Sequence, residues 1–228
     1  MLEKNLINFI QDLFVKYKHI WTWWPWESRV EIMVSAVLTQ LSKRQQVSRV
    51  LDNLKKNRRS SEEIGKKISH YDCNINLDWN IEKQIAEYCL NYLKEEDLKW
   101  VGFYKRKYQT IIELLKWFIG LDLDVPTLEL RKQLLNIKGI WKETADAILC
   151  YWLDKPSFVI DLYTYKVLYK NIFRQYYKDF KFFKKDYSYD KIQNLIENIL
   201  KDLKKDDIFW YKNLHWAFVE EGKKLNSK

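Results

Sequence analysis

Glycine and proline, the residues that most tight turns need, are scarce in this chain. Only 5 glycines and 3 prolines occur among its 228 residues. A sandwich of short strands, or a sheet alternating with helices, needs more turn residues than this. Apolar residues instead recur three and four positions apart along almost the whole chain. The sequence therefore predicts an all-α protein of roughly ten helices.

The same spacing indicates where the helices lie. They are expected over residues 2–14, 30–41, 45–57, 81–93, 105–119, 127–136, 142–153, 161–173, 191–203 and 208–224. A further short helix is expected to end near His70, because Ser60 or Ser61 with Glu63 forms a capping-box pattern. Residues 174–186 are basic and aromatic, and their pattern is a poor one for a helix.

Basic residues outnumber acidic ones in this chain. It has 40 Lys or Arg against 31 Asp or Glu, a net charge of +9. Such an excess favours a polyanionic partner, and nucleic acid is the first candidate. Hydrophobic residues make up 47% and charged residues 31%, a globular balance that excludes disorder of the whole chain.

No stretch of the sequence has the pattern of a signal peptide or a membrane span. Glu3, Lys4 and Asp12 interrupt the first apolar stretch, and no run of about 18 apolar residues occurs elsewhere. We therefore expect a cytoplasmic protein with no membrane partner.

The cysteines do not form a recognisable metal or disulfide pattern. Cys73, Cys89 and Cys150 are odd in number and far apart, and no C-x-x-C pair occurs. This argues against a disulfide framework, a structural zinc site and a cysteine-held iron–sulfur cluster. We expect no metal and no cofactor, with the cysteines as small core residues.

Four of the 11 tryptophans fall within six residues. They are Trp21, Trp23, Trp24 and Trp26, with Pro25 among them. One amphipathic helix cannot bury four such neighbours on one face. Some of the rings are therefore expected to line a cleft suited to a flat ligand. The alternative is that they are bulk that packs helices together.

The segment from Leu134 to Trp152 is predicted to form a helix, a tight turn and a second helix, with Gly139 in the turn. The first backbone N–H groups of the second helix lack intrahelical partners, so they form an anion site that the helix dipole strengthens. Lys138 and Lys142 add positive charge. A DNA phosphate would fit there. The alternative is an ordinary helical hairpin.

Several motifs occur in order along the chain. Gly139-Ile140 is followed by TADAIL (144–149) and FVID (158–161), with WWPW (23–26), AVLTQ (36–40) and GFY (102–104) upstream. The hairpin and the aspartate after it resemble the helix-hairpin-helix DNA glycosylases of the endonuclease III superfamily. The upstream motifs are similar to 3-methyladenine DNA glycosylase III, the branch without an iron–sulfur cluster. The resemblance runs from about residue 20 to 170, with a weaker match near His215.

The resemblance implies two helical lobes. Residues 21–154 would form a six-helix barrel that carries the helix-hairpin-helix at about 128–153. Residues 1–20 and 155–228 would form a lobe of terminal helices. The DNA cleft and the base pocket would lie between the lobes. The implied partner is double-stranded DNA with a damaged base, bound by a monomer. The hairpin residues implied in phosphate binding are Lys138, Gly139, Ile140, Trp141, Lys142 and Thr144.

Asp161 matches the aspartate that this superfamily uses for catalysis. Cleavage of an N-glycosidic bond develops positive charge on the sugar, and a fixed carboxylate beside C1′ stabilises it and orients water. Asp161 also has the pattern of a helix N-cap, which would help to keep it ionised. Asp146 is the competing carboxylate, and a local polar contact is expected for it.

Members that also cleave the strand carry a Schiff-base lysine immediately before the Thr-Ala pair. This chain has Glu143 there, and a carboxylate cannot form a Schiff base. Lys142 is one residue away, which is a rotation of about 100° on a helix. The sequence therefore predicts a monofunctional glycosylase with no AP-lyase activity.

The resemblance also implies a pocket for the flipped base. Trp23, Trp24 and Pro25 match its aromatic wall, which would attract a cationic alkylated purine such as 3-methyladenine. Arg44 stands where an opposing ring is expected, and an arginine would repel a cationic base. His215 is either a pocket hydrogen-bonding group or a core histidine.

Two further departures concern the lesion. Trp141 replaces the second glycine of the hairpin, and Ala217 stands where a pocket lysine is expected. Together with Arg44, they support an alternative hypothesis, a glycosylase of the same fold that releases a deaminated or oxidised base. A non-catalytic helix-hairpin-helix DNA-binding module is a third possibility, against which the register of Asp161 argues. Release of an alkylated purine is the favoured interpretation.

Overall fold

The computed structural model describes residues 2–18, 28–59 and 78–226. Within these ranges the chain consists of helices joined by turns and loops, and no strand occurs in them. The prediction of an all-α fold is therefore confirmed. Among the described residues, no helix is long and apolar enough to cross a membrane.

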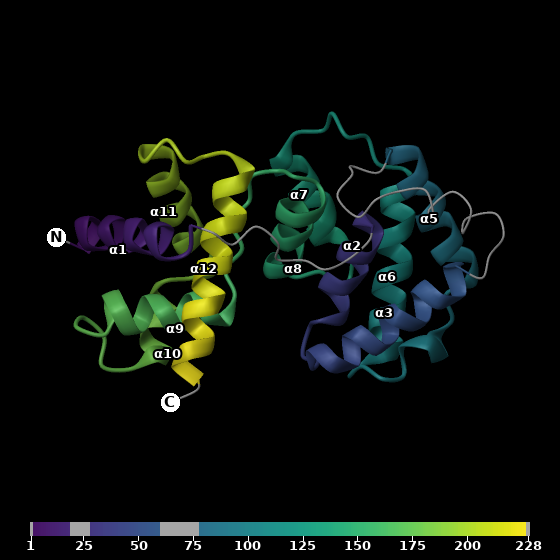
Figure 1. Cartoon of the computed structure of the whole chain (residues 1–228), viewed down its shortest axis with the longest axis horizontal. Helices are drawn as coiled ribbons and strands as arrows, with labels where there is room; N and C mark the ends of the chain where they lie inside the picture. The colour runs from purple at the N-terminus through teal and green to yellow at the C-terminus, as the bar shows by residue number, and fades with distance from the viewer. Residues whose placement is uncertain (1, 19–27, 60–77, 227–228) are drawn as a thin grey trace. The chain divides into compact units, whose positions relative to one another are not determined.

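The chain divides into two compact units (Figure 1). The terminal-helix unit comprises Met1–Trp23 and Leu149–Lys228, and the hairpin unit comprises Trp24–Ile148. Asp161 and His215 both belong to the terminal-helix unit. The candidate phosphate-binding residues, 138–144, all belong to the hairpin unit.

The hairpin unit is built around α2, which lies against four of its other helices. Buried apolar side chains extend around most of α2, among them Met33, Ala36 and Leu38, as expected for a central helix. The helices of this unit are α2 (Arg29–Leu38), α3 (Arg44–Arg59), α5 (Trp79–Tyr92), the 3-10 turn η1 (Glu95–Leu98), α6 (Tyr104–Ile119), α7 (Thr127–Asn136) and α8 (Lys142–Ala147).

The α2 helix ends at Leu38, three residues before the expected Leu41. The Nζ of Lys107, on α6, donates hydrogen bonds to the carbonyl oxygens of Leu38 at 2.9 Å and Gln40 at 2.6 Å. It also bonds the Oγ of Ser42 at 2.7 Å. The buried Lys107 ammonium therefore bonds carbonyl oxygens that would accept backbone N–H groups if the helix continued. This contact joins positions more than 60 residues apart, so helical periodicity gives no sign of it.

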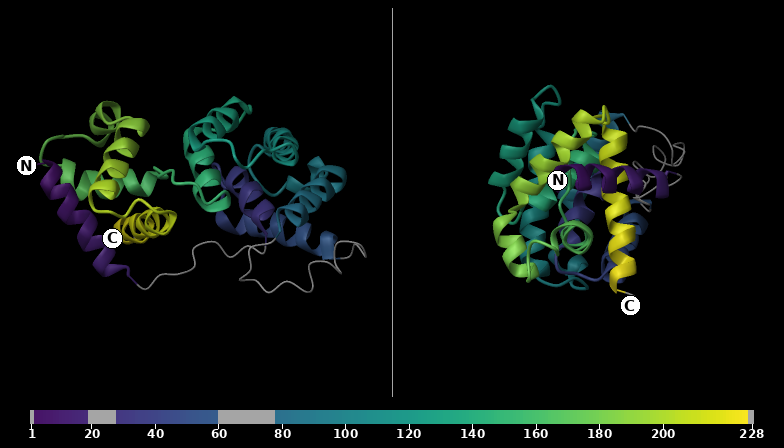
Figure 2. Two further views of the ribbon diagram at one scale, coloured as in Figure 1. Left: turned by 90° about the horizontal axis from the view of Figure 1, so that it is seen from above. Right: turned by 90° about the vertical axis from the view of Figure 1, so that its left-hand side faces the viewer.

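The terminal-helix unit packs its last helix against its first and against the helix that Asp161 caps. Figure 2 shows α1 and α12 side by side from a second direction. The elements of this unit are α1 (Leu2–Lys16), the π-helical turn η2 (Ile148–Trp152), α9 (Leu162–Leu168), the π-helical turn η3 (Tyr169–Phe173), α10 (Phe180–Asp186), α11 (Tyr189–Asp202) and α12 (Ile208–Asn226).

A glycine allows the closest approach of α12 to α9. A Cβ atom on Gly222 would lie 2.5 Å from the Cδ1 of Tyr163, closer than side-chain atoms pack. The absence of a side chain at Gly222 thus fixes the spacing of these two helices, and with it the position of residues on α12 relative to the start of α9.

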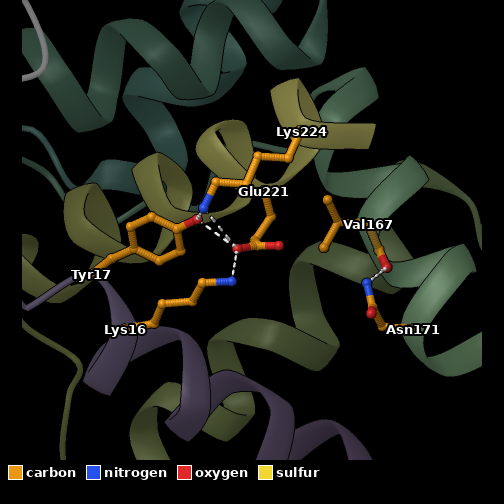
Figure 3. Close-up of polar contacts among 6 residues, drawn as sticks. All are labelled: Lys16, Tyr17, Val167, Asn171, Glu221 and Lys224. Carbon is orange, nitrogen blue, oxygen red and sulfur yellow. Dashed lines mark hydrogen bonds and ion pairs between the residues drawn. The ribbon is translucent and has the colours of Figure 1, made fainter. Parts of the chain in front are cut away.

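A cluster of charged and phenolic groups also joins the ends of α1 and α12. Figure 3 shows Lys16, Tyr17 and Lys224 directed toward the Glu221 carboxylate. Lys16 forms an ion pair with Glu221, and the Tyr17 hydroxyl donates to its Oε1 at 2.5 Å. The Nζ of Lys224 donates to the Tyr17 hydroxyl at 2.7 Å. Segments about 200 residues apart in sequence are thereby connected through one carboxylate.

The expectation of no helix within residues 174–186 is wrong, because Phe180–Asp186 form α10. The Asp179 carboxylate caps this helix by accepting the backbone N–H of Lys181 at 2.5 Å. Phe183 is completely buried and stacks on Phe173, with ring centroids 4.6 Å apart. Tertiary aromatic packing therefore stabilises a helix that its own periodicity does not indicate.

Candidate active site

The turn of the hairpin requires glycine at position 139 for two reasons. Gly139 has a φ of 96°, a conformation that side chains strain. A Cβ atom there would also lie 2.3 Å from the Oγ1 of Thr110, on α6. That hydroxyl donates to the carbonyl oxygen of Lys138 at 2.9 Å, so α6 holds the turn directly.

Gln40, the last residue of the AVLTQ motif, ties that motif to the hairpin. Its Nε2 donates to the carbonyl oxygen of Gly139 at 3.1 Å and to the Oγ1 of Thr144 at 2.8 Å. Two motifs that lie 99 to 104 residues apart in the sequence at these contacts are therefore joined in the structure. The sequence showed both motifs but not the contact between them.

Five of the six predicted phosphate-binding residues divide into an exposed and a buried group, and the sixth, Gly139, is half-buried. Lys138, Trp141 and Lys142 are exposed, and Trp141 keeps 67% of its surface accessible. Ile140 and Thr144 are buried and hold the turn from inside. Because α8 begins at Lys142, its first backbone N–H groups lack intrahelical acceptors. The exposed side chains of Lys138, Trp141 and Lys142 therefore lie at the same end of α8 as these amides.

Asp146 makes the local contact that was expected for it. Its carboxylate is completely buried and accepts two hydrogen bonds from Arg131, from Nε at 2.7 Å and from Nη2 at 2.9 Å. This bidentate ion pair connects α7 and α8, the two helices of the hairpin. Asp146 is therefore part of the hairpin structure.

Asp161 caps α9, as its sequence pattern predicted. One carboxylate oxygen, Oδ1, accepts the backbone N–H of Thr164 at 2.7 Å and the Thr164 hydroxyl at 2.9 Å. The side chain keeps 15% of its surface accessible. The carboxylate is thus fixed by the helix start and still reaches the surface.

A histidine and a tyrosine stand behind this carboxylate. The Nε2 of His215, on α12, lies 3.8 Å from the Oδ2 of Asp161, and the His215 side chain is only 6% exposed. The other ring nitrogen, Nδ1, is 2.6 Å from the hydroxyl oxygen of Tyr151. Tyr151, His215 and Asp161 therefore form a continuous chain of polar groups within the terminal-helix unit.

The electrostatics of this chain favour an ionised aspartate. Burial opposes ionisation of Asp161, but His215, followed by the backbone N–H and hydroxyl of Thr164, outweighs burial and holds the pKa of Asp161 below its usual value. Burial, together with Cys150 and Asp161, raises the pKa of Tyr151 well above its usual value. The tyrosine therefore keeps its proton while the aspartate gives its proton up.

The other predicted pocket residues lie in separate parts of the chain. Trp23, Trp24 and Pro25 are outside the described residues. Arg44 is the first residue of α3, in the hairpin unit, and it is exposed. Ala217 is completely buried in α12.

Two exposed apolar residues of the hairpin unit escaped the sequence reasoning. Leu41 is 84% exposed with a φ of 51°, and Phe103 is 69% exposed with a φ of 57°. The backbone N–H of Gly102 donates to the Oγ of Ser42 at 3.3 Å, which joins the two loops. Large apolar residues rarely adopt this strained backbone conformation. The GFY motif was a signal for Phe103, but periodicity does not reveal the exposure of either residue.

The described residues contain no group of three or more His, Cys, Asp or Glu side chains placed to hold a metal ion. Cys89 belongs to the hairpin unit and Cys150 to the terminal-helix unit, and Cys73 is outside the described residues. The expectation of no metal and no iron–sulfur cluster stays a prediction.

Comparison with known proteins decides the family. No family model matches the chain. A candidate DNA repair glycosylase of Methanocaldococcus jannaschii is 36% identical over 162 residues, which cover 70% of this chain and 67% of that protein. The chain belongs to the helix-hairpin-helix superfamily of DNA glycosylases. The resemblance to this superfamily seen in the sequence motifs is thereby confirmed.

Solved structures agree with this family. This glycosylase resembles the Helicobacter pylori 3-methyladenine DNA glycosylase bound to 1,N6-ethenoadenine, with a TM-score of 0.65 and 26% identity over 98% of each chain. It also shares its fold with endonuclease III in a trapped covalent DNA intermediate. That match has a TM-score of 0.60 and 13% identity, and it covers 95% of this chain and 85% of the other.

Proposed function

We propose that this glycosylase flips an alkylated purine such as 3-methyladenine out of double-stranded DNA and hydrolyses its N-glycosidic bond. The observation that carries the proposal is the fixed, ionised carboxylate of Asp161 at the start of α9. The likeness to the H. pylori enzyme at 26% identity supports an alkylated purine as the substrate class.

Asp161 would act on the sugar. As the C1′–N bond breaks, its electron pair leaves with the base, and positive charge develops at C1′. The Asp161 carboxylate stabilises that charge. Water then adds to C1′ and gives up a proton, which the carboxylate can accept. A base that alkylation has made cationic is already a good leaving group, so this site needs no strong general acid.

His215 and Tyr151 would prepare Asp161 for this role as positioning residues. Because the Tyr151 hydroxyl keeps its proton, it donates to the Nδ1 of His215. A ring that accepts this bond at Nδ1 carries its proton on Nε2, the nitrogen that faces Asp161. One tautomer is selected, and it presents positive polarity to the carboxylate. His215, on this proposal, supports the carboxylate, and the pocket role that the sequence also allowed becomes secondary.

The hairpin would bind a DNA phosphate. The amides at the start of α8 attract an anion, and the exposed Lys138 and Lys142 add charge beside them. Gly139, Ile140 and Thr144 would keep the turn in shape, and Trp141 would lie against the DNA. Such contacts position the duplex and do not select the base.

The same end of α8 supports a monofunctional enzyme. Glu143 stands where a Schiff-base lysine is needed, and its carboxylate cannot form the covalent intermediate. The product would therefore be an intact strand that contains an abasic site.

Leu41 and Phe103 would help to hold the flipped state. Base flipping leaves a gap in the stack, and proteins commonly insert apolar side chains between base steps. Two exposed apolar side chains held in strained backbone conformations, on adjoining loops of one unit, suit that task. The strain is tolerated because Lys107 and Ser42 hold the loops.

By the resemblance, Trp23, Trp24 and Pro25 would supply the aromatic wall of the base pocket, and Arg44 stands at the sequence position where an opposing ring is expected. Arg44 supports a second candidate function, release of an uncharged deaminated or oxidised base, because its charge would repel a cationic purine. Base release from duplexes that each carry one lesion tests the two candidates. Release of 3-methyladenine supports the first, and release confined to uncharged lesions supports the second. Absence of any release would indicate a binding module.

A further inference from the structure

Two thirds of the net charge of this chain is concentrated in 20 residues. Residues 166–185 contain seven Lys or Arg and one Asp, a net charge of +6 against +9 for the whole chain. This segment runs from α9 through η3 into α10, all within the terminal-helix unit. The charge therefore lies outside the hairpin.

The lysines around α10 are exposed, and most have no carboxylate partner. Lys178, Lys181 and Lys185 form no ion pair with any residue that the structure describes, and all three are exposed. Lys184 differs, because its ammonium lies 4.9 Å from the centre of the Tyr165 ring. We call Lys178, Lys181 and Lys185 the α10 basic surface.

Helix electrostatics do not explain this surface. The negative end of a helix dipole favours cations in the last turn, which accounts for Lys184 and Lys185. Lys181 is the second residue of α10, and Lys178 directly precedes the cap residue Asp179. A positive charge at that end of a helix is unfavourable. The neighbouring lysines also repel one another, so folding alone gives no reason for the arrangement.

Large exposed aromatic side chains accompany the basic residues. Phe182 is 66% exposed and lies between Lys181 and Lys185 in the sequence, whereas the next residue, Phe183, is completely buried. Tyr176 is 50% exposed in the preceding turn. Nucleic-acid surfaces combine positive charge with exposed aromatic rings, whereas a solvated face has no need of the rings.

We propose that the α10 basic surface is a second DNA contact of the glycosylase, which binds backbone phosphates of the duplex to one side of the lesion. The position of the lesion rests on the proposed role of Asp161. Asp161 and the α10 basic surface belong to the same unit. Phe183 of α10 packs against Tyr165 of α9, with ring centroids 6.1 Å apart, so α10 lies alongside the helix that Asp161 caps. The surface can therefore contact phosphates of the same duplex whose damaged nucleotide lies at Asp161.

The first test removes the charge. A variant with Lys178→Gln, Lys181→Gln and Lys185→Gln is compared with a control that carries Lys4→Gln, Lys18→Gln and Lys201→Gln. The control lysines are exposed residues of the same unit, and the net charge changes equally. We expect the first variant to bind a duplex at least about tenfold more weakly. The slope of its log binding constant against log salt concentration should be shallower by about 2 to 3. An equal loss in both variants would overturn the proposal.

The second test locates the contact on DNA. Two duplexes carry the lesion three base pairs from one end, either 5′ or 3′, and a third has long arms on both sides. The effect of the triple variant should disappear when one particular arm is shortened and persist when the other is shortened. An effect that persists on both short-arm duplexes would contradict a flanking contact.

Single-turnover release at saturating enzyme separates this proposal from the proposed function. The triple variant should release the base at the wild-type rate once it is bound, because the surface does not touch the reacting sugar. If Asp161 were not the catalytic carboxylate, the difference in DNA affinity between the triple variant and its control would still be expected. Phe182→Ala keeps the charge and should leave the salt slope for duplex unaltered. If Phe182→Ala and the triple variant weaken only single-stranded DNA binding, the surface is a single-strand site and the duplex proposal is wrong.

Discussion

The Nε2 of His215 lies 3.8 Å from the Oδ2 of Asp161, and the two residues belong to different helices, α12 and the start of α9. Titratable groups near this pair include Tyr151, its neighbour Cys150, Tyr211, and the ion pair of Lys212 with Asp154. The Lys212 ammonium lies 6.0 Å from the Tyr151 ring. Within this setting, His215 makes the largest contribution that lowers the pKa of Asp161.

Replacement of His215 should therefore change the pH dependence of base release. Asp161 acts as a carboxylate, and that form is populated above its pKa. In His215→Ala the burial of Asp161 remains while its main stabilising partner is lost, so its pKa rises. We expect the acid limb of the single-turnover rate profile to move to higher pH. His215→Gln can place a neutral N–H near the same carboxylate and should restore part of the shift. A lower rate with an unchanged profile would assign His215 a purely structural role.

Tyr151→Phe tests the selection of the tautomer. Removal of the hydroxyl leaves the Nδ1 of His215 without this donor, so the ring can carry its proton on the nitrogen that faces Tyr151. We expect release to slow by about 3- to 10-fold, or roughly 1 kcal/mol, with little change in DNA affinity. Tyr165→Phe is the control, because it removes the hydroxyl of another buried tyrosine of the same unit, outside this chain of groups. Equal effects of the two variants would refute the tautomer argument.

Gly139→Ala should weaken binding to damaged and undamaged duplexes alike. The new Cβ would meet the Thr110 hydroxyl and strain a φ of 96°, so the turn that presents the α8 amides would shift. A side-chain-bearing residue held in such a strained backbone conformation lowers the free energy of unfolding by about 1–3 kcal/mol. Gly120→Ala is a matched control, because its φ is −85° and its Cβ would have no neighbour closer than 3.8 Å. Thermal melting and duplex binding measure both effects. A loss confined to one lesion would exclude the phosphate role.

Glu221→Gln should destabilise the terminal-helix unit in a pH-dependent way. Burial acts to raise the pKa of Glu221, but Lys16, Tyr17 and Lys224 outweigh it and hold the pKa below its ordinary value. A carboxylate with a lowered folded-state pKa stabilises the fold above its unfolded pKa, and this contribution is lost as the pH falls through the folded-state pKa. Melting near pH 7 should show a loss of about 1–2 kcal/mol that disappears in acid. A pH-independent difference would contradict this account.

Borohydride added during turnover should trap no covalent protein–DNA species. Glu143 provides no amine for a Schiff base, and Lys142 is rotated by about 100° from that position. Glu143→Lys serves as the comparison, because it restores an amine at the family position. Trapping by the wild-type protein would show that another lysine has taken the role.

The sequence was sufficient to predict those features that depend on local patterns. The all-helical fold follows from apolar spacing and few turn residues. The capping role of Asp161 follows from its position at a helix start, and the local contact of Asp146 from its place within the second helix of the hairpin. The glycine in the hairpin was also identified from its local motif, because a tight turn between two helices has few alternatives.

The features that escaped prediction depend on contacts between distant segments. The early end of α2 results from Lys107, and α10 forms because Phe183 packs against Phe173. Tyr151 and His215 are 64 residues apart, so no spacing rule brings them together. The exposure of Leu41 and Phe103 depends on positive φ angles that apolar periodicity does not encode.

The most direct test of the central claim is single-turnover release of 3-methyladenine by Asp161→Asn, with duplex affinity measured in parallel. Asp179→Asn is the matched control, since it changes another N-cap carboxylate of the same unit and asparagine caps a helix equally well. We predict that Asp161→Asn releases the base at least about 100-fold more slowly at unchanged affinity, while Asp179→Asn retains the wild-type rate. Release by pure Asp161→Asn at a rate near that of the wild type would contradict the assignment of Asp161 as the catalytic carboxylate.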